Sequence, residues 1–513
     1  MAAEEDLIRA RFRPLFEPRS IAIVGASNGA RTRANDVLDF ALEMGFSGNV
    51  YPIHPTAEKI AGFTAYRSFA SCPTEIDYAF IAIAAAKVPD LLEHGGDRVR
   101  FAQIMSSGFG ETSEGEELNR RLLDVARRKG VRLIGPNCLG TYSPRGCVAY
   151  IRDSPVDAGS VGVAMQSGGL STDMLRRGVQ RGLRYSAVVS MGNCADLGPT
   201  DFLEYFLADP GTRVIGFYLE SLTEGRRFFE ALRDAQAAKP VVILKGGRTQ
   251  QGQRTASTHT GALGGDDRLW KALSRQTGAI LVDTIDELID TLLSFQCGEP
   301  RLGRPGDGAF LIGNGGGASV LATDQMARLG MRIRDISPQA RQALEAMRLP
   351  PGTSVNNPFD APSGALRVDD GRIAAGLLRA ITEVEQPDAL LYHVNMPQFL
   401  TNPSIPESVL DNLVDGAIQA HAGDAGGTPM FMVMRSDGSE SIDARKRKAR
   451  ARAQAAGIPV FDEITDAILA IYRFQQFEQF HWRVRNQSHA SDAVSAHATC
   501  DRNEISPVAH ARR

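Results

Sequence analysis

Short apolar runs alternate with longer amphipathic stretches along most of this chain. Within the first 150 residues the apolar runs lie at 20–24, 50–53, 77–83, 101–105 and 131–135. Each run is nearly continuous in apolar residues, and the stretches between the runs have the spacing typical of helices. Strands that alternate with helices predict right-handed βαβ units and a parallel sheet covered on both faces.

The same alternation continues through two further units. In the second unit the apolar runs lie at 161–165, 185–189, 214–219, 241–244 and 279–282, and in the third at 309–312, 389–394 and 430–434. A Gly/Pro-rich linker, 298–308, separates the two units. We therefore predict an α/β fold with units at 14–150, 158–298 and 309–480. The polar segment 486–513 lacks periodicity and is predicted to be a disordered tail.

The bulk composition limits the function classes that need to be considered. A length of 513 residues suits three or four domains of roughly 150 residues, and the net charge of −3 gives no reason to expect nucleic acid or an anionic membrane as a partner. The sequence contains no apolar stretch of about 18 residues, so no membrane span is predicted. The acidic N-terminus lacks a signal core, and the six cysteines show no CxxC pair or metal spacing. We expect a cytoplasmic protein without a metal site, and the basic cluster 445–448 is interpreted as a solvated helix face.

Turn-forming residues follow the first strand of the first unit. Gly25, Ala26 and Ser27 lie between that strand and a predicted helix, where backbone N–H groups suit a phosphate. The full GxGxxG spacing is missing, which disfavours an ordinary NAD site. Arg31 and Arg33 in the following loop are candidates to face an external phosphate. A tight turn with surface arginines is an equally good interpretation of this loop in isolation.

Other strand ends in the first unit carry similar residues. Pro52 lies near the end of the second run, Ser107 lies in the loop 106–111, and Asn137 lies in the loop 135–140. Ligands of open parallel sheets bind outside the carboxyl ends of the strands. Several such loops together indicate a ligand site rather than chance turns.

Two further glycine-rich turns lie between a strand and a helix. Ser167, Gly168 and Gly169 follow the first strand of the second unit, and Gly315, Gly316 and Gly317 follow the first strand of the third. Hydroxyl and N–H donors at these helix N-termini would hold a phosphate from two directions. A flexible loop is the alternative for the third-unit turn. A serine nucleophile at Ser167 is disfavoured because the sequence around it is not the GxSxG elbow.

A single histidine, His259, stands in the loop 256–265, which is built from small residues. The loop follows a predicted buried strand, and a helix is predicted to begin at Asp266 or Asp267. Small neighbours leave the imidazole accessible, so that it can act as a nucleophile and carry a phosphoryl group. Glu220 ends a preceding strand of the same sheet, where its carboxylate would fix the tautomer of the ring. The alternatives are a loop histidine that only packs or caps, and a surface glutamate.

In this order and across nearly the whole chain, these motifs resemble the nucleoside-diphosphate-forming acyl-CoA synthetase superfamily, which includes succinyl-CoA synthetase. Within it the sequence is most similar to the α subunits of ADP-forming acetyl-CoA synthetases. The resemblance implies a Rossmann-like CoA-binding domain followed by two flavodoxin-like parallel-sheet domains. It implies that His259 is the phosphohistidine and that Glu220 is its partner. It further implies CoA contacts from Gly25, Ala26, Ser27, Pro52, Ser107 and Asn137.

The motifs and the resemblance together predict the CoA-binding subunit of a ligase that forms acyl-CoA from an acid, CoA and ATP. No ATP-grasp region is recognised, so ATP, ADP and Mg²⁺ are expected to act through a separate ATP-grasp subunit, with a small carboxylic acid as substrate. A CoA-binding regulatory protein without the ligase cycle is the alternative from another class. An NAD-dependent dehydrogenase is disfavoured by the poor dinucleotide motif.

Overall fold

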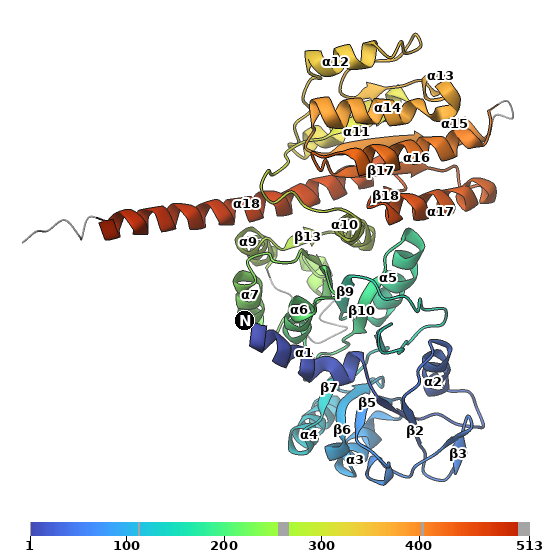
Figure 1. Ribbon diagram of the computed structural model, residues 1–513. Helices are drawn as coiled ribbons and strands as arrows, with labels where there is room; N and C mark the ends of the chain where they lie inside the picture. Colours follow the sequence, from blue (N-terminus) through green and yellow to red (C-terminus); the bar gives the residue numbers. More distant parts are fainter. Residues whose placement is uncertain (1, 111–112, 255–265, 402–404, 501–513) are drawn as a thin grey trace, which may run out of the picture.

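The computed structural model describes residues 2–110, 113–254, 266–401 and 405–500. Three largely parallel sheets, each with helices packed on its faces, follow one another along the molecule (Figure 1). Large apolar clusters continue across both junctions between the sheets, since buried side chains of the first and second units share one core and those of the second and third share another. The predicted α/β class with parallel sheets is confirmed.

The first sheet has the order β2-β1-β5-β6-β7, and all its pairings are parallel. Its strands are β1 (Ser20–Val24), β2 (Asn49–Ile53), β5 (Ile76–Ile81), β6 (Val99–Ile104) and β7 (Arg132–Ile134). The helices of this unit are α2 (Arg33–Glu43), α3 (Val88–Glu93) and α4 (Ser113–Lys129), and β3 (Lys59–Ile60) pairs with β4 (Phe63–Thr64). The buried strands have the continuous apolar character that a sheet covered on both faces requires.

The N-terminal helix α1 (Ala2–Phe16) packs against the second unit, although it precedes the first sheet in the chain. The ring of Phe16 stacks on that of Tyr205 with 4.2 Å between the ring centroids, and Phe12 lies 6.0 Å from Phe202. Both partners belong to α6 (Pro199–Ala208). The first and second units are therefore joined by an aromatic contact as well as by the chain.

The second sheet has the order β13-β12-β11-β9-β10-β8. Its strands are β8 (Thr141–Tyr142), β9 (Val161–Met165), β10 (Tyr185–Ser190), β11 (Val214–Leu219), β12 (Val241–Lys245) and β13 (Ile280–Val282). Its helices are α5 (Gly168–Arg181), α6, α7 (Gly225–Asp234), α9 (Asp267–Thr277) and α10 (Ile285–Cys297). β8 lies within the predicted first unit but pairs antiparallel with β10, so the second sheet takes its edge strand from that segment.

The third sheet has the order β15-β14-β16-β17-β18, again with parallel pairings. Its strands are β14 (Phe310–Gly313), β15 (Phe359–Asp360), β16 (Leu390–Asn395), β17 (Met430–Arg435) and β18 (Val460–Phe461). Its main helices are α11 (Gly316–Arg328), α12 (Pro338–Glu345), α14 (Ile373–Ala380), α16 (Ser408–Gly423) and α17 (Glu440–Ala455).

The long helix α18 (Ile464–Cys500) ties the third unit to the second. Phe474 of α18 stacks on Phe295 of α10, with 4.9 Å between the ring centroids. Glu478, also on α18, accepts hydrogen bonds from the backbone N–H groups of Arg301 and Gly306 in the linker. The helix continues into the stretch 486–513 that the sequence predicts to be a disordered tail, and residues 501–513 lie outside the described part of the chain.

Candidate functional site

The carboxyl edges of the first and second sheets meet at a tight junction of loops. Asn193, after β10, donates its backbone N–H to the carbonyl of Pro136 at 2.9 Å, and its side-chain amide donates to the carbonyl of Phe109 at 2.9 Å. A Cβ at Gly192 would lie 2.2 Å from the Pro136 oxygen, so a larger residue does not fit there. The junction therefore fixes the loops after β6, β7 and β10 relative to one another.

Gly25 has a structural reason to be glycine. Its φ of +102° lies in the region that favours glycine, and a Cβ would stand 2.4 Å from the carbonyl oxygen of Ala82. The following loop is closed by Asn35, whose side chain accepts the N–H of Ser27 at 3.1 Å and donates to the Ser27 carbonyl at 3.0 Å. Thr32 caps α2 and donates its hydroxyl to the Gly25 carbonyl. Loop 28–35 thus replaces the missing glycines with side-chain hydrogen bonds.

Both arginines of this loop have partners within the chain. Arg31 forms ion pairs with Asp36 at 2.7 Å and Asp39 at 2.9 Å, both on α2, while its side chain stays 57% exposed. Arg33 donates to the carbonyl of Tyr150. A contact of these arginines with an external phosphate stays a prediction, and at Arg31 such a phosphate would compete with two carboxylates.

The other predicted CoA contacts differ in exposure. Ser107 and Asn137 are exposed, and Asn137 donates its side-chain amide to Asn193 Oδ1 at 3.3 Å. Ala26 and Pro52 are buried. The exposed side chains offer neutral hydroxyl and amide groups at the carboxyl edge of the first sheet, whereas Ala26 and Pro52 contribute only backbone and shape.

In the second sheet, Gln166 organises the end of β11. Its side-chain oxygen accepts the backbone N–H groups of Glu220 at 2.5 Å and of Ser221 at 3.0 Å. The half-buried Glu220 carboxylate accepts a hydrogen bond from the Tyr218 hydroxyl at 3.0 Å. The residues after β9 and β11 are therefore held together by one amide side chain, a role the sequence did not reveal.

Lys245 completes this strand-end cluster. It is the register partner of Leu219 and donates its ammonium to the main-chain carbonyl of Glu220 at 2.9 Å. Burial lowers the pKa of Lys245 from its ordinary value, and the Glu220 carboxylate opposes that shift. β12 therefore ends beside Glu220, and the segment that leads from β12 to His259 begins at this point.

His259 itself lies outside the described residues, as does the whole stretch 255–265. Ion pairs and a helix cap fix the described residues on both sides of this stretch. Arg248 forms ion pairs with Asp267 and Asp283. Asp266 caps α9 by accepting the Arg268 N–H at 2.9 Å, which confirms the predicted start of that helix.

The glycine-rich turn after β9 leaves donors available. Ser167 is the N-cap of α5 and accepts the Leu170 N–H at 3.3 Å through its hydroxyl oxygen, which leaves the hydroxyl proton free to donate. A Cβ at Gly168 would lie 2.9 Å from Leu139 Cγ, and a Cβ at Gly169 would meet open space. Leu139 follows Asn137 by two residues, so this N-terminus lies beside the junction of the two sheets.

The glycine-rich turn after β14, unlike the turn after β9, is already hydrogen-bonded to a carboxylate of the chain. The backbone N–H of Gly315 donates to the Asp360 carboxylate at 3.0 Å, and a Cβ at Gly316 would lie 3.2 Å from the other oxygen of that carboxylate. The buried Asn314 links the turn to β16 and to Gln398. Gly317 borders open space. An internal carboxylate therefore already occupies part of the N-terminus where the sequence predicts a phosphate.

The described residues contain no group of His, Cys, Asp and Glu side chains placed to hold a metal, and no helix among them has the length and apolarity to cross a membrane.

Comparisons with known proteins agree with this arrangement. Residues 19–144 match the model of a CoA binding domain, and residues 158–295 match that of a succinyl-CoA ligase like flavodoxin domain. The chain is 34% identical over 373 residues to acetate–CoA ligase [ADP-forming] I subunit alpha of Pyrococcus furiosus, covering 71% of this chain and 79% of that protein.

Two further relatives extend the likeness to the third unit. Acetate–CoA ligase [ADP-forming] I of Archaeoglobus fulgidus is 32% identical over 461 residues, covering 89% of this chain and 62% of that protein. A solved dinucleotide forming acetyl-coenzyme A synthetase 1 from Ca. Korarchaeum cryptofilum, in complex with phosphate and ADP, has a TM-score of 0.79 and 27% identity, covering 93% of this chain and 98% of that one. This chain therefore belongs to the family of ADP-forming acyl-CoA ligases, as an acid–thiol ligase of the α-subunit type.

Proposed function

We propose that the chain is the CoA-binding, phosphohistidine-bearing subunit of a ligase that converts an acid, CoA and ATP into acyl-CoA, ADP and phosphate. The observation that carries this proposal is the strand-end cluster of Gln166, Glu220 and Lys245. It places a carboxylate beside the strand from which the His259 loop departs.

In the synthetic direction, one nitrogen of His259 takes the γ-phosphoryl group while Glu220 accepts a hydrogen bond from the other nitrogen. This hydrogen bond raises the nucleophilicity of the ring and stabilises the positive charge of the phosphorylated form. His259 then passes the phosphoryl group to the carboxylate of the acid, which gives an acyl phosphate. Attack of the CoA thiolate on the acyl carbon releases phosphate and yields acyl-CoA.

The phosphoryl group needs donors while it is transferred. The hydroxyl of Ser167 and the N–H groups of Gly168 and Gly169 supply them at the N-terminus of α5, where the helix dipole favours negative charge. Gly315, Gly316 and Gly317 supply a second set once the Asp360 carboxylate moves aside, because Asp360 holds the Gly315 N–H in this structure.

CoA lies along the carboxyl edge of the first sheet. Gly25 lets a ligand approach the backbone, and the exposed Ser107 and Asn137 offer polar contacts. Ala26, Ser27 and Pro52 shape the same edge. Because this edge meets the second sheet at Asn193, the thiol end of CoA can reach the α5 N-terminus near Leu139 without crossing the molecule.

We further propose that a separate ATP-grasp subunit supplies ATP and the Mg²⁺ that accompanies its phosphates. The naming of the Pyrococcus furiosus relative as a subunit alpha supports a partner chain. The acid is a small carboxylic acid.

The experiment is a coupled ligase assay with the chain, a candidate ATP-grasp subunit, ATP, Mg²⁺, CoA and a panel of acids. We expect ADP release that requires both acid and CoA and that disappears in His259→Ala. If His259→Ala binds CoA and turns over like the wild type, the phosphohistidine route is wrong. If CoA binds but no acid supports turnover with a partner of proven activity, the regulatory alternative replaces the ligase.

A further inference from the structure

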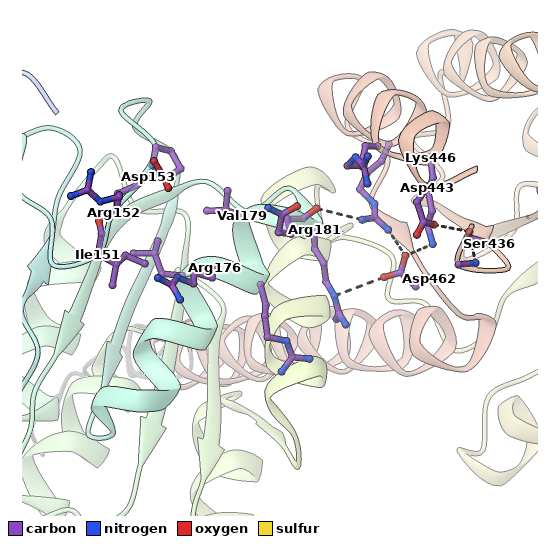
Figure 2. Close-up of a pocket in the computed structure, with 18 of the residues that line it drawn as sticks. Ile151, Arg152, Asp153, Arg176, Val179, Arg181, Ser436, Asp443, Lys446 and Asp462 are labelled. Atoms are coloured by element: carbon purple, nitrogen blue, oxygen red, sulfur yellow. Dashed lines mark hydrogen bonds and ion pairs between the residues drawn. The ribbon is translucent and has the colours of Figure 1, made fainter. Parts of the chain in front are cut away.

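A second polar site lies between the second and third units, along the C-terminal half of α5, whereas the strand-end cluster lies before the N-terminus of that helix. It is a cleft of about 810 Å³ whose walls are α5 with the loop 151–155 on one side and α17 on the other, with residues 462–463 between β18 and α18 at its floor (Figure 2). That volume falls within the range of small-molecule sites. Its apolar lining residues, Ile151, Pro155, Leu175 and Val179, all come from α5 and the loop 151–155, so the second unit forms the apolar end. The third unit contributes only charged or small residues.

The charged lining is dominated by cations. Seven of its residues are Lys or Arg and four are Asp or Glu. The two walls present these cations to each other, since Arg176 and Arg181 come from α5 and Lys446, Arg447 and Arg450 from α17. The sequence suggested a solvated face for 445–448, but Lys446 and Arg450 are only 8% exposed.

One carboxylate faces three of these cations. Asp462 pairs with Lys446 at 2.5 Å, with Arg450, and with Arg181 at 3.9 Å. Figure 2 shows these interactions converging on Asp462 from both walls. Burial raises the pKa of Asp462, but Arg450 and Lys446 outweigh that effect, and the net shift is downward. Arg181 also pairs with Asp286 at 2.6 Å and with Asp290 at 3.0 Å. The floor is therefore close to charge balance, and the excess of cations lies on the walls, where Arg176 and Arg447 stand.

Two donors at the cleft have no partner in the described part of the chain. The buried Nε of Arg450 makes no hydrogen bond there, although buried polar side-chain atoms are normally paired. The exposed Arg176 makes no ion pair among the described residues. Among the described residues, Arg447 pairs with Glu440 alone, whose side chain is 88% exposed. These groups have donor capacity for an incoming anion.

We propose that this cleft binds a multiply charged phosphate compound, such as an organic diphosphate, with its carbon skeleton at the apolar end. Arginine forks bind phosphate oxygens in pairs, which fits a site with guanidinium groups on both walls. The compound would bridge α5 to α17 and so hold the second and third units together. The site is independent of the ligase chemistry, because none of its residues belongs to the strand-end cluster or to the CoA edge.

The test is isothermal titration calorimetry of the full chain at low ionic strength, with ADP and with inorganic pyrophosphate as probes. The variant Arg176→Glu/Arg447→Glu changes one exposed residue on each wall. Arg328→Glu, at an exposed arginine of α11, is the control for charge reversal away from the cleft. We expect both probes to bind the wild type and Arg328→Glu equally, and the dissociation constants to rise at least tenfold in the double variant.

Tighter binding of ADP than of pyrophosphate would assign the apolar end to the organic part, and equal binding would show that the phosphates alone are recognised. The milder Arg176→Gln/Arg447→Gln should weaken binding by a smaller factor and guards against a folding defect in the reversal variant. The proposal is overturned if neither probe binds the wild type below about 1 mM. It is equally overturned if the double variant binds as the wild type does, because the phosphates would then lie elsewhere, such as at the CoA edge.

Discussion

The second and third sheets each send a strand through a glycine-rich turn into a helix, but the two helix N-termini differ. In the second sheet the turn leaves Ser167 with a free hydroxyl proton, and a neighbouring amide, Gln166, organises Glu220. In the third sheet the turn is already bound by a carboxylate, Asp360. The same strand–glycine–helix motif therefore gives an open donor site in one unit and a filled one in the other.

The cause lies on the adjacent strands rather than in the turns. Asp360 ends β15, which is the parallel neighbour of β14, so its carboxylate reaches the Gly315 N–H. β9 has β11 as its neighbour, and the corresponding carboxylate there, on Glu220, accepts from Tyr218 instead. A glycine-rich turn thus indicates where an anion fits, and the neighbouring strand decides whether the protein supplies that anion itself.

The largest expected effect is from Glu220→Gln. Loss of the carboxylate removes the partner proposed for His259, and we expect the turnover number of the coupled assay to fall by about 10²–10³-fold with little change in CoA affinity. Steady-state kinetics with CoA calorimetry measure both. Glu224→Gln, an exposed carboxylate four residues further along, is the matched control. Equal activity of Glu220→Gln and Glu224→Gln would remove Glu220 from the site.

Gln166→Leu tests the amide that positions Glu220. The variant leaves two backbone N–H groups without an acceptor, and we expect a loss of about 1–3 kcal/mol in unfolding free energy and a tenfold or greater fall in turnover. Urea denaturation and the coupled assay report the two effects. Gln166→Glu keeps both acceptor contacts and should retain more activity than Gln166→Leu. If Gln166→Leu loses stability but no activity, the amide has only a structural role.

Ser167→Ala and Asp360→Ala test whether the glycine-rich turns after β9 and β14 differ in function. Removing the Ser167 hydroxyl should lower turnover by about tenfold and cost about 1 kcal/mol of stability as a lost helix cap. Removing the Asp360 carboxylate should instead raise the affinity for inorganic phosphate a few fold, because the Gly315 N–H becomes available. Calorimetric titration with inorganic phosphate distinguishes the effects of the two variants. Identical responses would mean that the two turns do not differ in function.

The smallest effect is a pH dependence of stability at the contact between the second and third units. Burial raises the pKa of Asp290 and of Glu478 to about 7. In the native state these acids keep protons that the unfolded chain releases above about pH 4, so their contribution to stability falls as the pH rises from about 4 to 7 and is constant above that.

Thermal unfolding between pH 5 and pH 8 measures this slope. Glu478→Gln and Asp290→Asn should each flatten it relative to the wild type. Because burial lowers the pKa of His393 to about 4, that residue gives a slope of opposite sign below about pH 6.5, and only the difference between variant and wild type isolates the acids. Glu463→Gln, an exposed carboxylate change at the same contact, is the control. An unchanged slope in both variants would contradict the assignment.

Much of this fold follows from the sequence because buried parallel strands are continuous apolar runs. The runs 161–165 and 214–219 coincide with β9 and β11. Two-residue strands such as β8 and β18 carry no periodicity and exist only through distant partners, so they were missed. The packing of α1 on α6 was also missed, since nothing local shows where Phe12 and Phe16 find their partners.

The candidate site divides in the same way. Glu220 and Ser167 could be singled out because their positions at strand ends fix their place in a parallel sheet. The acceptor role of Gln166 and the capture of Gly315 by Asp360 depend on side-chain directions across separate strands, which spacing does not encode. The ion pairs of Arg31 were missed for the same reason, since its partners Asp36 and Asp39 lie on the helix that follows the loop.

Whether His259 carries the phosphoryl group can be tested in the reverse half-reaction, without a partner subunit. The full chain is incubated with labelled inorganic phosphate and a panel of acyl-CoA thioesters, beside His259→Ala, and the peptide that contains residue 259 is analysed by mass spectrometry. We expect an acid-labile phosphoryl group on His259 that forms only with an acyl-CoA and is absent from the variant. A chain that binds CoA yet gains no phosphoryl group with any thioester, or gains it equally in His259→Ala, would show that His259 does not carry the phosphoryl group.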